Sequence, residues 1–341
     1  MKLPVEWHRA VIRGERRGPL ALLARAALRV ASWPYGLGVR WRNRGFDRGT
    51  RAIHRAAVPV VSVGNLSLGG TGKTPCVEYV ATFYRERGVQ VAILSRGYGT
   101  DAGPNDEAMV LEENLPDVPH LQGADRSALA DAAVEELEAE LLVLDDGFQH
   151  RRLHRDLDIV LIDATSPPHE DCLFPRGTLR EQPSSLKRAD AILLTRCDQV
   201  SEAEVDAIRE WLKGKAPGVP IATTEHRPAA NELSGATVGA FCGIGNPESF
   251  RRTLESLGAV VAEFRTFPDH HAYSRKDVDD LRAWALGLPP GAAVATTQKD
   301  WVKLRLDELS GRPLHTVKIE MVVREGEAEL HEQLSHVIKH E

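Results

Sequence analysis

The stretch that most constrains the fold is VPVVSVGNLSLGGTGKTP, which runs from Val58 to Pro75. An apolar run, a Gly-rich turn and Gly-Lys-Thr follow one another, an order typical of a strand, a phosphate-binding loop and the start of a helix. The usual motif begins with Gly five positions before the Gly of Gly-Lys-Thr, whereas this chain has Ser67. Ser suits that position if its φ is negative, so we still expect the loop to bind phosphate.

The residues of this loop have distinct expected roles. Gly69, Gly70 and Gly72 let the backbone approach a ligand closely, and N–H groups at the start of a helix favour an anion. Lys73 is expected to contact the β- and γ-phosphates of ATP, and the Thr74 hydroxyl to bind Mg²⁺. The complete expected nucleotide site consists of Ser67, Leu68, Gly69, Gly70, Thr71, Gly72, Lys73 and Thr74.

Apolar runs alternate with helical stretches in the rest of the chain. VQVAILS, ELLVLDD, LDIVLID and ADAILLT predict strands of a first set, and TVGAFCGI, AVVAEFRTF, GAAVATTQ and HTVKIEMVV predict strands of a second. Between the sets, residues 200–235 predict a helix followed by Pro- and Gly-rich turns. The pattern indicates an α/β fold of the P-loop type, with a mainly parallel sheet and helices on both faces. We expect this core at residues 51–230 and a smaller C-terminal α/β domain at residues 231–341 that closes the cleft, with the final helix either remaining there or packing back on the core.

The N-terminal segment differs in charge from the remainder of the chain. Residues 1–57 contain 13 Lys and Arg but three Asp and Glu, a net charge of +10, while the remainder carries −16. Within residues 1–50, apolar residues recur at helical spacing from Leu20 to Ala31, whereas Arg25 and Arg29 lie on another face. These arginines exclude a membrane-spanning helix. A basic amphipathic helix either lies in an anionic membrane surface or packs on its own domain, and both interpretations stay open.

Two adjacent carboxylates, Asp145 and Asp146, end the apolar run ELLVLDD. An Asp at a strand end beside a phosphate loop is the expected holder of Mg²⁺ or of its water shell. Because neighbouring strand residues point to opposite faces, we expect one of the two to bind the ion directly.

Transfer of a phosphoryl group to a hydroxyl also requires a group that accepts the proton. The candidates are Asp106 and Glu107 in GPNDEAMVL, and Asp269, His270 and His271 in FPDHHAYS. An Asp and a His brought together from these segments would form a base whose orientation and pKa are set by its partner.

Further polar residues follow the predicted strands in the segments SRGYG, GADR, DDGFQH and GTLRE. Arginines at the carboxyl ends of parallel strands suit phosphate recognition, because a guanidinium group can bind two phosphate oxygens at once. The candidate substrate-binding residues are Arg96, Tyr98, Arg126, Gln149, His150, Arg180 and Glu181.

Two other functions remain open from the residues alone. A membrane-associated P-loop ATPase switch has a similar loop, but such ATPases carry Lys where this chain has Leu68. A P-loop kinase of a soluble small molecule would have no evident need for the basic N-terminal segment.

The chain resembles the tetraacyldisaccharide 4'-kinase family, which acts in lipid A biosynthesis, from about Arg13 onward. The motifs VGNLSLGGTGKTP, LSRGYG, GADR, LDDGFQH, GTLRE, FPDHHAY and TTQKDWVKL carry the resemblance and occur in the family's order. It implies transfer of the γ-phosphate of ATP, with Mg²⁺, to the 4'-hydroxyl of a tetraacyldisaccharide 1-phosphate. It also places Asp106 on the residue proposed as base and His270 on its proposed partner.

The resemblance further implies a peripheral enzyme at the cytoplasmic face of the inner membrane. Its partners would be a glycolipid substrate and anionic inner-membrane lipids, with no nucleic acid. Two segments depart from the family pattern: residues 105–108 read NDEA in place of Gly-Asp-Glu-Pro, and SPPHEDCLF replaces a Gly-Asn-Gly segment in the loop at residues 163–174.

Overall fold

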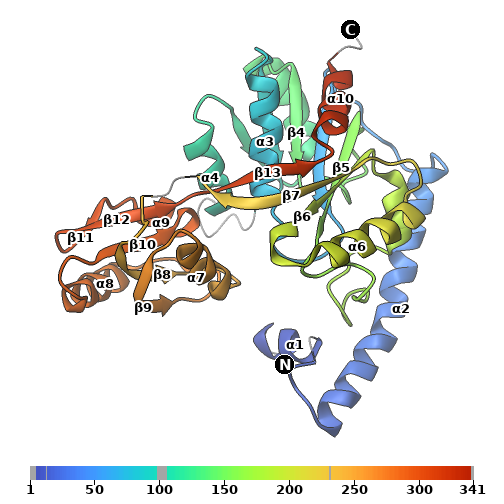
Figure 1. Cartoon of the computed structure of the whole chain (residues 1–341). Helices are drawn as coiled ribbons and strands as arrows, with labels where there is room; N and C mark the ends of the chain where they lie inside the picture. The colour runs from blue at the N-terminus through green and yellow to red at the C-terminus, as the bar shows by residue number, and fades with distance from the viewer. Residues whose placement is uncertain (1–4, 13, 98–105, 230–231, 339–341) are drawn as a thin grey trace.

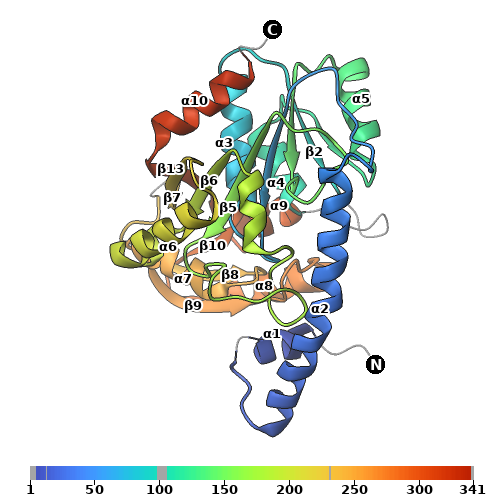
Figure 2. The same cartoon turned by 90° about the vertical axis from the view of Figure 1, so that its right-hand side faces the viewer.

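The computed structural model describes residues 5–12, 14–97, 106–229 and 232–338, which form two sheets, the helices around them and a long N-terminal helix (Figures 1 and 2). The first sheet has eight strands in the order β13-β7-β6-β5-β1-β4-β2-β3, and the second has five in the order β11-β12-β10-β8-β9. Among the described residues the pairings are parallel except for β13 with β7 and β11 with β12. The predicted α/β fold with a mainly parallel sheet is confirmed.

The first sheet has helices on both of its faces, as the sequence predicts. Its strands are β1 Val60–Asn65, β2 Val91–Ser95, β3 His120–Gln122, β4 Leu141–Asp145, β5 Leu157–Asp163, β6 Ala191–Thr195, β7 Ile221–Pro228 and β13 Ile319–Glu325. Its helices are α3 Lys73–Arg85, α4 Asp106–Asn114, α5 Arg126–Leu137, α6 Glu202–Lys215 and α10 Glu327–Val337, with 3-10 helices η1 Pro183–Arg188 and η2 Cys197–Gln199. Strands β1, β2 and β5 are buried along their whole length, which explains why they read as continuous apolar runs.

Alternate residues of the central strands enter separate cores. Val61, Val143 and Ile159 pack with α3 and α10 on one face of the sheet. On the other face, Val160 packs with α6 and η1, and Leu142 packs with α5. This alternation fixes the register of the strands, because a shift of one residue would exchange the two faces.

The second sheet has its own core. Its strands are β8 Thr237–Cys242, β9 Val260–Thr266, β10 Ala293–Thr297, β11 Glu308–Leu309 and β12 Arg312–Val317, and its helices are α7 Pro247–Ser256, α8 Arg275–Gly287 and α9 Gln298–Leu304. Phe250 and Leu254 of α7 pack on one face, and Leu281 and Trp284 of α8 pack with Phe241 on the other.

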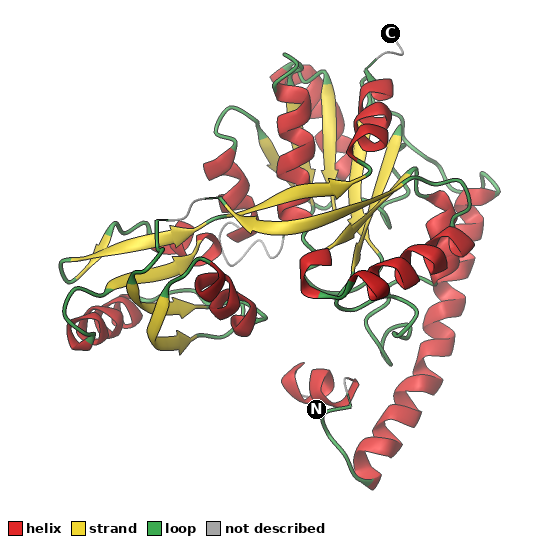
Figure 3. Cartoon of the chain, viewed as in Figure 1, coloured by secondary structure: helices red, strands yellow, loops and turns green. Residues whose placement is uncertain are grey.

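The two sheets are connected by the long antiparallel pair β7 and β13 (Figure 3). The run HTVKIEMVV is therefore not one strand of the second set: it is divided at Lys318 between β12, which pairs with β10, and β13, which pairs with β7. Strand β7 itself occupies a segment for which the sequence pattern predicts turns. After β13, helix α10 packs on the core of the first sheet, where Tyr84 Oη donates a hydrogen bond to the Leu334 carbonyl at 2.8 Å.

Helix α2, Pro19–Asp47, follows the short helix α1, Val5–Ile12, and projects beyond the rest of the chain (Figure 2). It buries a narrow face of small and aromatic residues, Ala21, Ser32, Gly36 and Phe46. The opposite side carries an apolar stripe, which we define as Leu20, Leu23, Val30, Trp33, Leu37 and Trp41, each 63–74% exposed. One face of α2 thus packs on the protein, as one interpretation predicts, while the other face is exposed and its contact with a membrane stays a prediction. No helix in the described part of the chain combines the length and apolar character needed to cross a membrane.

Candidate active site

The segment around Ser67 is extended and is paired with the GTLRE motif. Ser67 has a negative φ and forms an antiparallel bridge with Leu179. The Leu68 N–H donates a hydrogen bond to the Thr178 carbonyl at 2.8 Å. An extended residue needs no glycine, which explains why Ser can occupy the first position of the motif.

Beyond Ser67, the loop crosses the carboxyl ends of β6 and β7. Thr195 Oγ1 donates to the Thr71 carbonyl at 3.0 Å, and Asn65 Nδ2 donates to Thr71 Oγ1 at 2.7 Å. Gly72 has φ 87° and caps α3, and a Cβ atom there would lie 2.6 Å from Nε2 of His226. The loop therefore needs glycine at this position for both its conformation and its space.

The residues that follow the loop face the acidic end of β4. Lys73 is the first residue of α3, and its Nζ lies 3.6 Å from Asp146 Oδ1. Arg180 Nη1 donates to both carboxylate oxygens of Asp146 at 2.7 Å. Burial alone would raise the pKa of Asp146, but Lys73 and Arg180 lower it overall. The charge of Asp146 is thus already balanced by two cations.

Asp145 has a different environment from its neighbour. Burial raises the pKa of Asp145 to about 6; Lys73 opposes this rise, and the nearby negative charges of Glu107 and Asp146 add to it. Its Oδ1 atom is buried and has no hydrogen-bond partner among the described residues. The buried carboxylate oxygen of Asp145 and the buried hydroxyl residue Thr74, at the start of α3 after the phosphate loop, are of the oxygen type that Mg²⁺ prefers as ligands.

Asp106 and His270, which are 164 residues apart, form a hydrogen-bonded pair. His270 Nδ1 lies 2.9 and 3.0 Å from the two carboxylate oxygens of Asp106. Asp106 begins α4 and its side chain is 6% exposed, whereas that of His270 is 57% exposed. Since an ionised carboxylate only accepts, Nδ1 carries the proton and Nε2 is the nitrogen turned away from Asp106.

The two groups shift each other's proton affinity in opposite directions. Burial by itself would raise the pKa of Asp106, but the hydrogen bond from His270 and the charges of Lys299 and Lys303 lower it to about 2. The hydrogen bond to Asp106 raises the pKa of His270 above its ordinary value. The pair therefore titrates as a unit in which Asp106 stays ionised and His270 exchanges the proton.

Three of the candidate substrate residues surround Asp146. Arg126 Nη1 donates to the Asp146 carbonyl at 3.2 Å, and Arg180 Nη1 also lies 3.3 Å from Gln149 Oε1. Gln149 Nε2 in turn donates to the Asn65 carbonyl at 2.9 Å. These contacts connect the end of β4 with the end of the neighbouring strand β1, from which the phosphate loop leads to α3.

Other candidates have more separate positions. His150 is partly buried, and burial together with the charge of Arg126 lowers its pKa to about 4, so this imidazole is neutral at pH 7. Arg96 is exposed directly after β2. Tyr98 lies outside the described residues.

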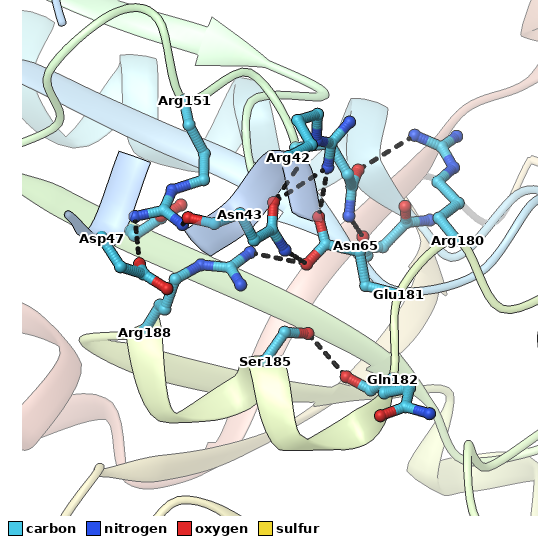
Figure 4. A network of polar contacts seen from close by, with 12 residues as sticks. Arg42, Asn43, Asp47, Asn65, Arg151, Arg180, Glu181, Gln182, Ser185 and Arg188 are labelled. Carbon is cyan, nitrogen blue, oxygen red and sulfur yellow. Dashed lines mark hydrogen bonds and ion pairs between the residues drawn. The ribbon is translucent and has the colours of Figure 1, made fainter. Parts of the chain in front are cut away.

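Glu181 is occupied by contacts within the fold, as Figure 4 shows. Its side chain is 1% exposed, and Oε1 accepts a hydrogen bond from Arg42 at 2.8 Å. Oε2 accepts from Asn43 at 2.9 Å and from Arg188 at 3.0 Å. Within the fold, Glu181 thus fixes the C-terminal part of α2 at Arg42 and Asn43, and its expected substrate contact stays a prediction.

Several residues of the site are not among the site residues predicted from the sequence. They are Thr195 and His226 at the phosphate loop, and Lys299, Asp300 and Lys303 near the Asp106–His270 pair. The last three occur in TTQKDWVKL, where the spacing of four residues places Lys299 and Lys303 on one face of a helix. That spacing was the available signal for a second cationic contact to the site.

A cavity of about 500 Å³ lies between α2 and the segment at residues 172–182. Its lining combines arginines with apolar side chains and includes Arg29, Trp33, Leu37, Arg40, Leu173 and Arg176. Part of the apolar stripe borders this cavity, so an amphipathic molecule could contact the arginines and the stripe together.

Comparison with known proteins places this geometry in a family. The model of the LpxK family, tetraacyldisaccharide-1-P 4'-kinase, matches residues 24–339. Tetraacyldisaccharide 4'-kinase of Anaeromyxobacter dehalogenans (strain 2CP-C) is 40% identical over 345 residues, covering 92% of this chain and 90% of the relative. That of Syntrophus aciditrophicus (strain SB) is 36% identical over 354 residues, covering 90% and 91%.

A solved structure agrees with these relatives. LpxK from Aquifex aeolicus, in an "apo" form in complex with ATP, superposes with a TM-score of 0.74 at 30% identity, covering 92% of this chain and 99% of that one. The match includes both sheets, because it spans nearly all of each chain. The chain therefore belongs to the tetraacyldisaccharide-1-phosphate 4'-kinase family.

Proposed function

We propose that this chain transfers the γ-phosphate of ATP to the 4'-hydroxyl of a tetraacyldisaccharide 1-phosphate, a step of lipid A biosynthesis. Membership of the kinase family supports the reaction. The observation that carries it is the Asp106–His270 pair, with Nδ1 2.9 Å from the carboxylate. A nucleotide switch that only hydrolyses ATP has no need of a paired base for an alcohol, so the pair favours the kinase.

Phosphate binding would be the task of the loop and of α3. The backbone N–H groups after Gly69 and the N-terminus of α3 favour the anionic phosphates, and Lys73 would contact the β- and γ-phosphates. Thr74 and Asp145 would hold a Mg²⁺ ion, which when bound neutralises charge on the phosphates. We assign Asp145 to this role because both oxygens of Asp146 already accept hydrogen bonds from Arg180.

The proton of the 4'-hydroxyl would pass to the Asp106–His270 pair. As the hydroxyl oxygen bonds to the γ-phosphorus, its O–H bond breaks and the bond from that phosphorus to the β–γ bridging oxygen breaks, releasing ADP. The resemblance assigns the base role to Asp106, and the opposite pKa shifts support the pair as the accepting unit. The pair with Asp106 ionised and His270 neutral is the form that can take the proton.

A lipid acceptor requires contact with a membrane surface. We propose that the apolar stripe of α2 enters the interface of the inner membrane at its cytoplasmic face, while Arg25, Arg29 and Arg40 meet anionic headgroups. The cavity beside α2 would then open at headgroup level. Residues 231–341, apart from β13 and α10, would close the cleft over the acceptor.

An assay of the purified protein with ATP, Mg²⁺ and tetraacyldisaccharide 1-phosphate in detergent micelles tests this function. The expected product is the disaccharide bisphosphate, and Lys73→Ala should abolish it. ATP hydrolysis stimulated by vesicles without a phosphorylated lipid would favour the switch. Detergent-independent transfer by a chain lacking residues 1–50 would favour a soluble acceptor.

A further inference from the structure

We propose that Asp300 and Lys303 of α9 are positioning residues for phosphoryl transfer, because together they fix both members of the Asp106–His270 pair. The inference rests on the proton-accepting role proposed above for that pair. Both residues lie inside the fold: Asp300 is fully buried, and the side chain of Lys303 is 14% exposed with its Nζ atom buried.

Asp300 fixes the backbone at His270 through one intervening glycine. Asp300 Oδ2 accepts the Gly243 N–H at 2.9 Å, and the Gly243 carbonyl accepts the His270 N–H at 3.1 Å. His270 has φ 58°, a left-handed conformation that persists in a non-Gly residue only when its surroundings hold it. Asp300 is itself fixed by hydrogen bonds from Thr297 Oγ1 at 2.6 Å and Tyr273 Oη at 3.0 Å.

The space around Gly243 shows how tightly this connection is packed. A Cβ atom at Gly243 would lie 3.0 Å from Asp300 Oδ1 and 3.1 Å from the Pro268 carbonyl. Gly243 therefore lies close to both the buried carboxylate and the chain that enters the turn at His270. A change in the charge or hydrogen bonding of Asp300 would be transmitted to the backbone of His270.

Lys303 provides the second connection, to Asp106. Its buried Nζ lies 3.5 Å from Asp106 Oδ2 and 3.5 Å from Asp300 Oδ1. Asp300 and Lys303 are three residues apart in α9, so the helix presents both on one side. One ammonium group thus joins a carboxylate of the first sheet's unit to a carboxylate of the second, and its removal would leave the two anions facing each other.

The charged groups around the Asp106–His270 pair determine the direction in which loss of Lys303 shifts the proton affinity of the pair. Asp106 is faced by His270 and by the cations of Lys299 and Lys303, with Glu107 beside it on α4. His270 is faced by Asp106, Asp269 and Lys299. Because Lys303 opposes protonation of the pair, its loss should raise the pair's proton affinity and keep His270 protonated to higher pH.

The experiment compares Lys303→Met and Lys303→Arg with the wild-type protein, and Glu113→Gln serves as the matched control. Glu113 lies 3.8 Å from Arg305, so its variant removes another ion pair near the same α4–α9 contact without touching the Asp106–His270 pair. Two quantities are measured: the pH dependence of kcat/KM, and the titration of the His270 ring by NMR. The NMR titration does not depend on catalysis, so it separates this proposal from a failure of the proposed function.

Lys303→Met should shift both the acid limb of kcat/KM and the His270 titration to higher pH and lower kcat at pH 7 by about tenfold, with the KM for ATP changed less than about twofold. Lys303→Arg should restore most of the rate, and Glu113→Gln should behave as the unchanged chain. Should Lys303→Met not fold, Lys303→Gln takes its place, and Asp300→Asn should broaden or shift the His270 resonance. Unshifted titrations in folded Lys303→Met or Lys303→Gln, or no recovery with Lys303→Arg, would overturn the proposal.

Discussion

Arg180 binds both carboxylate oxygens of Asp146 through a single nitrogen, Nη1, at 2.7 Å from each. This contact joins the GTLRE segment, which is paired with the phosphate loop at Ser67, to the acidic end of β4. Glu181, the next residue, accepts hydrogen bonds from Arg42 and Asn43 and so fixes the C-terminal part of α2. One short segment thus connects the loop, the Asp pair and the N-terminal helix.

We expect Arg180→Met to lower kcat by roughly 10–100-fold, because Asp146 loses its hydrogen-bonded cationic partner and the loop loses a fixed neighbour. Arg180→Lys should recover only part of the rate, since an ammonium lacks the guanidinium geometry. Steady-state kinetics at saturating ATP measure both variants. Arg209→Gln, which removes a partly exposed arginine that pairs with Asp206 and Glu325 outside these contacts, is the control and should leave kcat unchanged. A rate for Arg180→Met equal to that of the control would refute the connection.

Two substitutions in the phosphate loop should have opposite results. Ser67→Gly should retain activity within about twofold, because an extended residue does not need glycine. It should lower the free energy of unfolding by about 0.5–1 kcal/mol, because glycine gives the unfolded chain more conformational entropy. Gly72→Ala should reduce ATP affinity by at least about tenfold, since φ 87° is strained for Ala and Cβ would meet His226. ATP titrations by calorimetry and thermal melts compare them. Equal ATP affinities in the two variants would contradict this account of the loop.

The pH dependence of kcat/KM should report the Asp106–His270 pair. Because the hydrogen bond to Asp106 raises the pKa of His270, the rate should rise with pH through a pKa above the ordinary histidine value of about 6.5 and then level off. Asp106→Asn removes the negative charge, so the acid limb should move to lower pH while the plateau falls by roughly 10²–10⁴-fold. ATP affinity should stay close to that of the unchanged chain. An acid limb that moves to higher pH in Asp106→Asn would be inconsistent with the pair.

The apolar stripe of α2 should govern binding to vesicles. Trp33→Glu removes a side chain that is 72% exposed, and losing roughly 1.5–3 kcal/mol of burial in the membrane should weaken binding at least tenfold. Val260→Glu is a matched control, because Val260 is 60% exposed but lies on β9 in the second sheet. Sedimentation with anionic vesicles measures both, and ATP affinity should not change. Equal vesicle binding by the two variants would contradict the proposal that α2 contacts the membrane.

Much of the fold could be predicted because the central strands are buried on both faces and read as apolar runs. Strand β7 could not, since its largely polar sequence, IATTEHRP, is stabilised by pairing with β13, which comes much later in the chain. The division of HTVKIEMVV between two sheets is likewise a tertiary effect, because nothing in this segment indicates which strand each half will pair with.

The active site likewise has parts that the sequence predicts and parts that it does not. The phosphate loop and the Asp145–Asp146 pair are recognisable because each lies within a short segment whose order determines its geometry, although the sequence does not say which carboxylate would bind the ion. The pairing of Asp106 with His270 depends on family resemblance, since 164 residues separate them. The contact between Lys303 and Asp106 could be found only from the structure, because it depends on how α9 packs against α4.

The central claim is that this site phosphorylates a lipid hydroxyl with Asp106–His270 as proton acceptor. Mass spectrometry of the lipid after incubation with ATP and Mg²⁺ tests it directly, comparing the unchanged chain with Asp106→Ala at equal ATP occupancy. We predict one added phosphate at the 4' position for the unchanged chain, and a rate reduced by about 10²-fold or more for the variant. Absence of the bisphosphate with folded, ATP-binding protein, or equal rates for the two proteins, would contradict the account.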